Sequence, residues 1–109
     1  MNIQEQHIAT IQLINKDLEL NLLSDINDMD LLDYIADWIY ALVDNNPEQL
    51  FSLLYRLDVD EQKVHAAMRL DAKEPTNIAI AKLIIERQKQ KIQSRILYSD
   101  ENDKGDGSW

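Results

Sequence analysis

The sequence predicts an all-α protein: a compact bundle of about five helices with a long C-terminal helix and a disordered acidic tail. Apolar residues recur at steps of three and four along most of the chain, which is the helical period. The chain has only 2 glycines and 2 prolines, too few for the tight turns of an all-β protein. With 109 residues and 45% apolar composition it fits one helical domain, residues 1–98, followed by a flexible tail, residues 99–109.

The first helix is predicted from Ile3 to about Leu22, because its apolar side chains form one stripe. The stripe comprises Ile3, His7, Ile11, Ile14, Leu18 and Leu22. Short polar side chains in residues 24–28 can then cap a second helix.

The second helix, about Met29 to Asp44, has the clearest two-faced pattern in the chain. Its apolar face carries Leu31, Ile35, Trp38, Ile39 and Leu42. The opposite face carries the aspartates Asp30, Asp33, Asp37 and Asp44. The apolar face must be covered by other helices, whereas the aspartate face is left to solvent or to a partner.

Two short helices are predicted next, to about Leu57 and from Glu61 to about Leu70. Asn46 and Pro47 suit the start of the first, and Asp58 to Glu61 restart the chain. The expected inward side chains are drawn from Leu50, Phe51, Leu53 and Leu54, then Val64, Ala67 and Met68. The pair has the proportions of a helix-turn-helix, and its second helix offers Gln62, Lys63, His65 and Arg69. Because acidic residues stand where phosphates would approach, a nucleic-acid-associated regulator is the alternative function and nucleic-acid binding the weaker expectation.

Pro75 predicts a break, followed by one continuous helix over residues 77–98. Residues 78–85 read IAIAKLII, apolar nearly all round, as expected for a helix buried on several sides. Residues 86–95 are mostly polar, and Arg87, Lys91 and Arg95 form a basic stripe. The helix is therefore expected to start in the core and to leave it. The apolar residues expected to strengthen a contact with a partner are Ile92, Ile96, Leu97 and Tyr98. Trp109 is a candidate anchor in the tail, and the sequence leaves open whether it docks on a partner or folds back on its own domain.

Charge is distributed unevenly along the chain, whose net charge is −9. Residues 1–62 carry 13 acids and 2 bases, whereas residues 63–98 carry 8 bases and 3 acids. An aspartate stripe on one helix and a basic stripe on another favour docking. The pattern leaves open whether the stripes meet within one chain, between two copies or on a third protein.

No catalytic, cofactor or metal site is predicted. The chain has no cysteine, both glycines lie in the tail, and no HExxH motif surrounds His7 or His65. The acidic tail resembles a calcium loop only in part, because Lys104 stands where an oxygen ligand is needed. The aspartates near the second helix are explained by capping and solvation.

Three segments carry a resemblance to a known group of proteins: Tyr55 to Glu61, Ile84 to Gln88, and the closing Trp109. With these segments the chain resembles a group of small bacterial all-helical proteins of unknown function. The resemblance implies a compact helical fold and a cytoplasmic setting, and it implies no site residues.

The leading hypothesis is a non-catalytic protein–protein interaction or adaptor protein, with self-association through the last helix as one form of it. It would use the basic last helix and the aspartate face of the second. No small-molecule substrate is identified. The N-terminal residues lack the pattern of a secretory signal, and no apolar run reaches the ~20 residues of a membrane span, so a cytoplasmic protein is expected.

Overall fold

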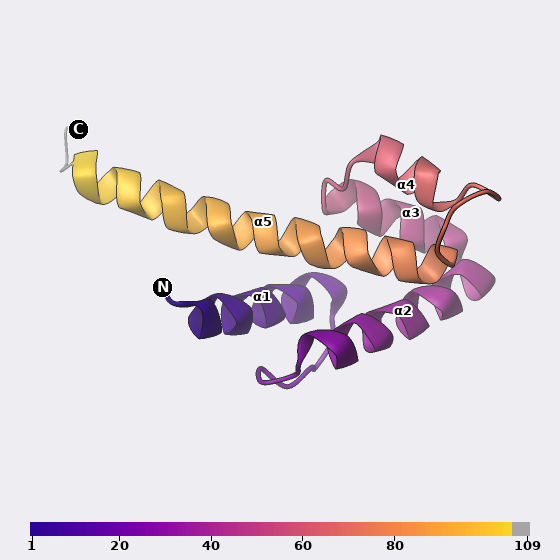
Figure 1. Cartoon of the computed structure of the whole chain (residues 1–109), viewed down its shortest axis with the longest axis horizontal. Coiled ribbons are helices and arrows are strands. Elements are labelled where there is room, and N and C mark those ends of the chain that lie inside the picture. The colour runs from indigo at the N-terminus through magenta and orange to yellow at the C-terminus, as the bar shows by residue number, and fades with distance from the viewer. Residues whose placement is uncertain (106–109) are drawn as a thin grey trace.

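The structure is a computed structural model that describes the backbone of residues 1–105 and the side chains of residues 1–98. Five helices make up the described residues, which confirms the all-α prediction. They are α1 (Ile3–Leu18), α2 (Asp28–Asn45), α3 (Pro47–Arg56), α4 (Glu61–Ala67) and α5 (Thr76–Gly105). In Figure 1, α5 runs along the whole molecule, with α1 and α2 below it and α3 and α4 above.

The capping residues set the helix starts. Asn27 accepts a hydrogen bond from the Asp30 amide at 2.8 Å at the start of α2. Asn46 does the same for α3, with proline at the first helical positions. Asp60 caps α4 by accepting from the Gln62 amide. Each of these starts confirms a prediction made from short polar side chains.

The core lies where α2 and the beginning of α5 cross. Ile35 and Ile39 of α2 and Ile80 and Ile84 of α5 are fully buried. Side chains of α1, α3 and α4 complete the same cluster, namely Ile11, Ile14, Leu18, Leu50, Leu53, Leu54, Val64 and Ala67. The prediction that the second helix and the start of the last one are central is confirmed.

Two helices end earlier than expected. α1 stops at Leu18 rather than near Leu22, because Glu19 adopts a left-handed backbone with φ 57°. α4 stops at Ala67 rather than near Leu70. Leu70 is fully exposed, so extending the helix to it would bury no apolar surface. Most of the stability of helices in proteins comes from packing of an apolar face.

α5 differs from expectation at its middle and at its end. It was expected to leave the core after residue 85, yet Gln88 and Ile92 are still buried. It was also expected to end at Tyr98, and its backbone continues as helix to Gly105. Adding a residue to an existing helix gains one hydrogen bond without a new nucleation cost, and no glycine or proline intervenes before Gly105. Residues 106–109, with Trp109, lie outside the described residues.

Among the described residues, no helix combines the length and the apolar character needed to cross a lipid bilayer.

Candidate protein-interaction surface

A groove of about 930 Å³ opens between α3 and α4. Buried Leu54 and Val64 lie at its base. Phe51 and Tyr55, one turn apart on α3, line its side and are 48% and 90% exposed. The other lining residues are Ser52, Asp58, Val59, Asp60, Glu61 and His65. The groove is therefore an apolar surface bordered by carboxylates.

The groove exists because α3 is apolar on two sides. One side, with Leu50, Leu53 and Leu54, packs into the core. Phe51 and Tyr55 are spaced four residues apart and so share a second side of the helix. The prediction that some of the four apolar side chains of α3 are buried is confirmed by the three leucines, and Phe51 is the one that lies half-exposed in the groove.

The junction between α3 and α4 is a closed helix-ending motif. The Val59 amide donates to the Leu54 carbonyl at 3.1 Å, and the Asp58 amide donates to the Tyr55 carbonyl at 3.0 Å. This pair of bonds defines a Schellman motif, which needs a left-handed residue at its turn. Asp58 supplies it with φ 61°, a conformation that aspartate tolerates better than most side chains.

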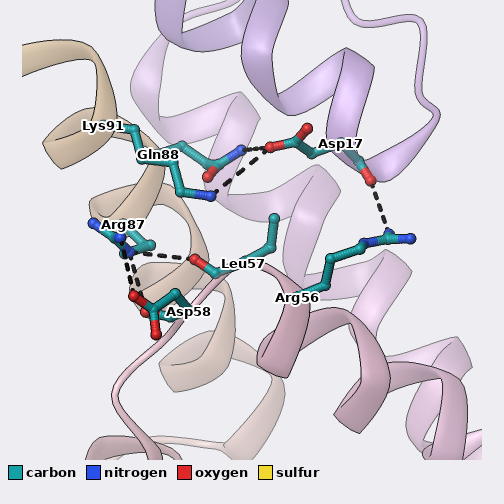
Figure 2. Close-up of polar contacts among 7 residues, drawn as sticks. All are labelled: Asp17, Arg56, Leu57, Asp58, Arg87, Gln88 and Lys91. Carbon is teal, nitrogen blue, oxygen red and sulfur yellow. Dashed lines mark hydrogen bonds and ion pairs between the residues drawn. The ribbon is translucent and has the colours of Figure 1, made fainter. Parts of the chain in front are cut away.

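Arg87 of α5 contacts this junction through its guanidinium group (Figure 2). Its Nε donates to the carbonyl oxygens of Leu57 at 3.2 Å and Asp58 at 3.1 Å. Its Nη2 lies 3.4 Å from Asp58 Oδ2. These carbonyls lie where the helix leaves acceptors without helical partners. Arg87, expected on a surface for partners, instead fixes the turn between α3 and α4.

Asp17 of α1 is a second residue that binds α5 through polar contacts. Gln88 Nε2 donates to Asp17 Oδ2 at 2.8 Å, and Lys91 Nζ lies 4.0 Å from the same oxygen. Arg56 Nη2 donates to the Asp17 carbonyl at 3.2 Å (Figure 2). Burial lowers the pKa of Lys91 below its usual 10.5, and the Asp17 carboxylate opposes this shift. Two members of the predicted basic stripe thus contact acidic groups of their own chain.

The remaining predicted residues of α5 are divided between core and surface. Ile92 is 4% exposed and belongs to the core. Ile96 is half-buried, and Arg95 and Tyr98 are exposed. The exposed basic and apolar surface of α5 is consequently smaller than the sequence indicated, and it begins near Arg95.

The predicted aspartates of α2 are all exposed. Asp30 accepts a hydrogen bond from the Asn27 side chain at 3.1 Å, so it takes part in capping. Among the residues whose side chains are described, no ion pair involves Asp33 or Asp37. These two carboxylates remain available to a partner.

The histidines and the helix-turn-helix candidate lie as follows. Nε2 of half-buried His7 lies 2.6 Å from the Ile26 carbonyl, and His65 is exposed on the groove. Within the described part of the chain, no three acidic or histidine side chains converge to hold a metal ion.

Arg69 lies beyond the end of α4 and bonds to Asp71 at 3.1 Å, so it is not on a recognition helix.

In the part of the chain that the structure describes, fold and surface define a small all-α protein with exposed carboxylates on α2 and an exposed apolar groove between α3 and α4. No protein-family model, curated protein or solved structure matches the chain at a significant level.

Proposed function

We propose that this chain is a non-catalytic protein-interaction or adaptor protein that binds a basic partner. The observation that carries the proposal is the outer face of α2. Seen along the helix axis it gathers the exposed residues Asp30, Asp33, Tyr34, Asp37, Tyr40 and Asp44 within about one-third of the circumference. α2 contains no lysine or arginine.

The aspartates are placed where they do not help α2 itself. Asp33 and Asp37 are like charges four residues apart, an arrangement that costs an isolated helix about 0.2–0.5 kcal/mol. Asp44 stands in the last turn, close to the negative end of the helix dipole. Only Asp30, in the first turn, is favourably placed for the helix. The stability of α2 therefore does not explain this face, whereas a cationic partner would.

Tyr34 and Tyr40 add apolar surface for binding energy to the face of α2 that carries the carboxylates. Exposed ion pairs contribute only about 0–1 kcal/mol each, so charge alone orients a complex more than it holds it together. Tyr34 and Tyr40 are 47% and 63% exposed, and tyrosine is among the residues that dominate binding energy in protein interfaces. A face with both features suits steering by charge and anchoring by aromatic rings.

Most of the predicted basic stripe of α5 has no part in the proposed contact. Arg87 and Lys91 contact Asp58 and Asp17 of their own chain. The nucleic-acid alternative has less support, because α4 spans only Glu61–Ala67. That is about two turns, and its N-terminal end is acidic.

Self-association is the second candidate, favoured by the exposed end of α5. Leu97 and Tyr98 are 65% and 61% exposed on a helix that extends beyond α1 (Figure 1). Light scattering at tens of micromolar tests it. A dimer that reverts to monomer in Leu97→Ser would support it, and a monomer throughout would end it.

The main proposal is tested by neutralising the α2 face. The double variant Asp33→Asn, Asp37→Asn is compared with the native chain by cross-linking in the source cells and mass spectrometry. The matched control, Asp25→Asn with Glu86→Gln, removes the same charge from exposed positions elsewhere. Basic proteins captured by the native chain should be lost in the α2 variant and kept in the control. Equal capture by all three, or no basic protein captured, refutes the proposal.

A further inference from the structure

The groove between α3 and α4 offers a second surface whose chemistry is separate from the aspartate face. We infer that this groove takes a short amphipathic helix of a partner protein, with apolar anchors facing the groove and lysine or arginine beside them. The inference rests on the proposed function in that it assigns a docking site to an interaction protein. It can fail without the α2 face failing.

The apolar part of the groove has room for side chains of a partner. A volume of about 930 Å³ is at the upper end of the range of ligand-binding pockets. Phe51 and Tyr55 leave large aromatic surfaces in water, which is unfavourable unless something covers them. Helices that dock in grooves present anchors at steps of three, four and seven residues. The one-turn spacing of Phe51 and Tyr55 matches the spacing of such anchors.

The border of the groove selects the charge of the occupant. Three of the lining residues, Asp58, Asp60 and Glu61, are acidic, and no lining residue is lysine or arginine. The carboxylate of Asp58 forms an ion pair with Arg87, and one carboxylate oxygen of Asp60 caps α4. Capping does not remove the negative charge of Asp60, and Glu61 is exposed. A cationic segment is attracted here, whereas an acidic peptide or a nucleic acid is repelled.

The described part of α5 leads away from the groove. Arg87 touches the groove junction, and from there to Gly105 α5 rises about 27 Å away from α3 and α4 (Figure 1). An acidic segment would also be repelled by the carboxylates that border the groove.

The junction at one end of the groove is held by contacts within the chain. The left-handed turn at Asp58 sets the direction in which α4 leaves α3, and Arg87 ties that turn to α5. Preorganised sites lose less conformational freedom on binding, which favours affinity from a small contact area. A short helix with two or three anchors is a suitable ligand for such a site.

The test uses two designed 15-residue amphipathic peptides with the same leucine pattern, one with lysine and one with glutamate at the polar positions. Nitrogen-15 NMR titration of the full chain maps binding, and fluorescence anisotropy gives Kd. The leucine–lysine peptide should shift amides of α3 and α4 and bind at least about tenfold more tightly than the leucine–glutamate peptide. Shifts confined to α2, or equal affinity for both peptides, overturn the inference. The first result would leave the proposed function standing.

Variants make the test specific. Phe51→Ser with Tyr55→Ser should weaken binding by about tenfold or more, as the loss of central aromatic anchors does. Tyr34→Ser with Tyr40→Ser is the matched control on α2 and should change Kd less than about twofold. The four substituted positions are all exposed, so both variants should keep the native circular dichroism spectrum. Equal weakening by both variants refutes the groove as the binding site.

Discussion

Replacing Arg87 with methionine is the most direct test of how α5 holds the α3–α4 junction. Methionine keeps most of the unbranched apolar stem of arginine and removes all of its donors. The substitution therefore deletes the bonds to the Leu57 and Asp58 carbonyls and the ion pair with the Asp58 carboxylate. Packing around the stem should change little.

The magnitude follows from which of these contacts is shielded from water. The two carbonyls share a single Nε–H, so together they count as one charge-assisted hydrogen bond worth about 1.5–3 kcal/mol. The Asp58 side chain is 88% exposed, and its ion pair adds only about 0–1 kcal/mol. Arg87→Met should therefore lower the free energy of unfolding by about 2–3 kcal/mol.

Urea unfolding followed by circular dichroism measures this loss. With a slope of about 1–3 kcal/mol per molar urea, a loss of about 2–3 kcal/mol should lower the midpoint by about 0.7–3 M. Lys82→Met is the matched control, because Lys82 lies on the same helix and forms an exposed pair with Glu74. The control should cost about 0–1 kcal/mol. If Arg87→Met costs no more than Lys82→Met, the interpretation of Arg87 as the fastening of the junction is wrong.

Further substitutions test the core, the left-handed turn and the half-buried Lys91. Ile84→Ala should destabilise by about 2–5 kcal/mol in urea, because Ile84 is 0% exposed, whereas Ile3→Ala, at 85% exposed, should stay within about 0.5 kcal/mol. Asp58→Val should lower the free energy of unfolding by about 1–2 kcal/mol, because a branched β-carbon is unfavourable in the left-handed conformation of residue 58. Asp58→Gly should lower it less, because glycine has no β-carbon. Equal losses would contradict the claim that the left-handed conformation at φ 61° limits which residue fits. Because the folded pKa of Lys91 is lowered, the unfolded chain binds more protons between that pKa and 10.5, and stability relative to Lys91→Met should rise with pH across this window. Urea midpoints of both proteins at pH 8 and pH 10.5 measure it, and a difference that is constant or falls with pH would contradict it.

The parts of the fold that depend on local chemistry could be predicted from the sequence. Asn27, Asn46 and Asp60 cap helices where short polar side chains were expected to, because a cap needs only the next three residues. The apolar run from Ile78 to Ile85 is central, because a helix that is apolar all round has no favourable place except the interior. Both inferences follow from the composition of a single segment.

The groove could have been partly predicted from the sequence. The contacts by which Arg87 holds the α3–α4 junction could not. Phe51 and Tyr55 are spaced four apart and lie off the leucine stripe of α3, so a second apolar side was visible in the sequence. The contact of Arg87 with Leu57 and Asp58 joins residues about 30 positions apart and leaves no periodic signal. Regular spacing shows which residues share a face of a helix, but not what packs against that face.

The same reasoning changes the meaning of the charge asymmetry. α1 lies alongside α5, with Asp17 bonded to Gln88. Beyond the start of α1 at Ile3, α1 no longer covers α5 (Figure 1). The length of α1 therefore decides how much of the basic stripe is covered. Part of the attraction between the acidic first half and the basic second half is satisfied inside the molecule by Asp17 and Asp58. The surface that remains for a partner is mostly acidic, which is why we propose a basic partner although the sequence predicted a basic helix as well.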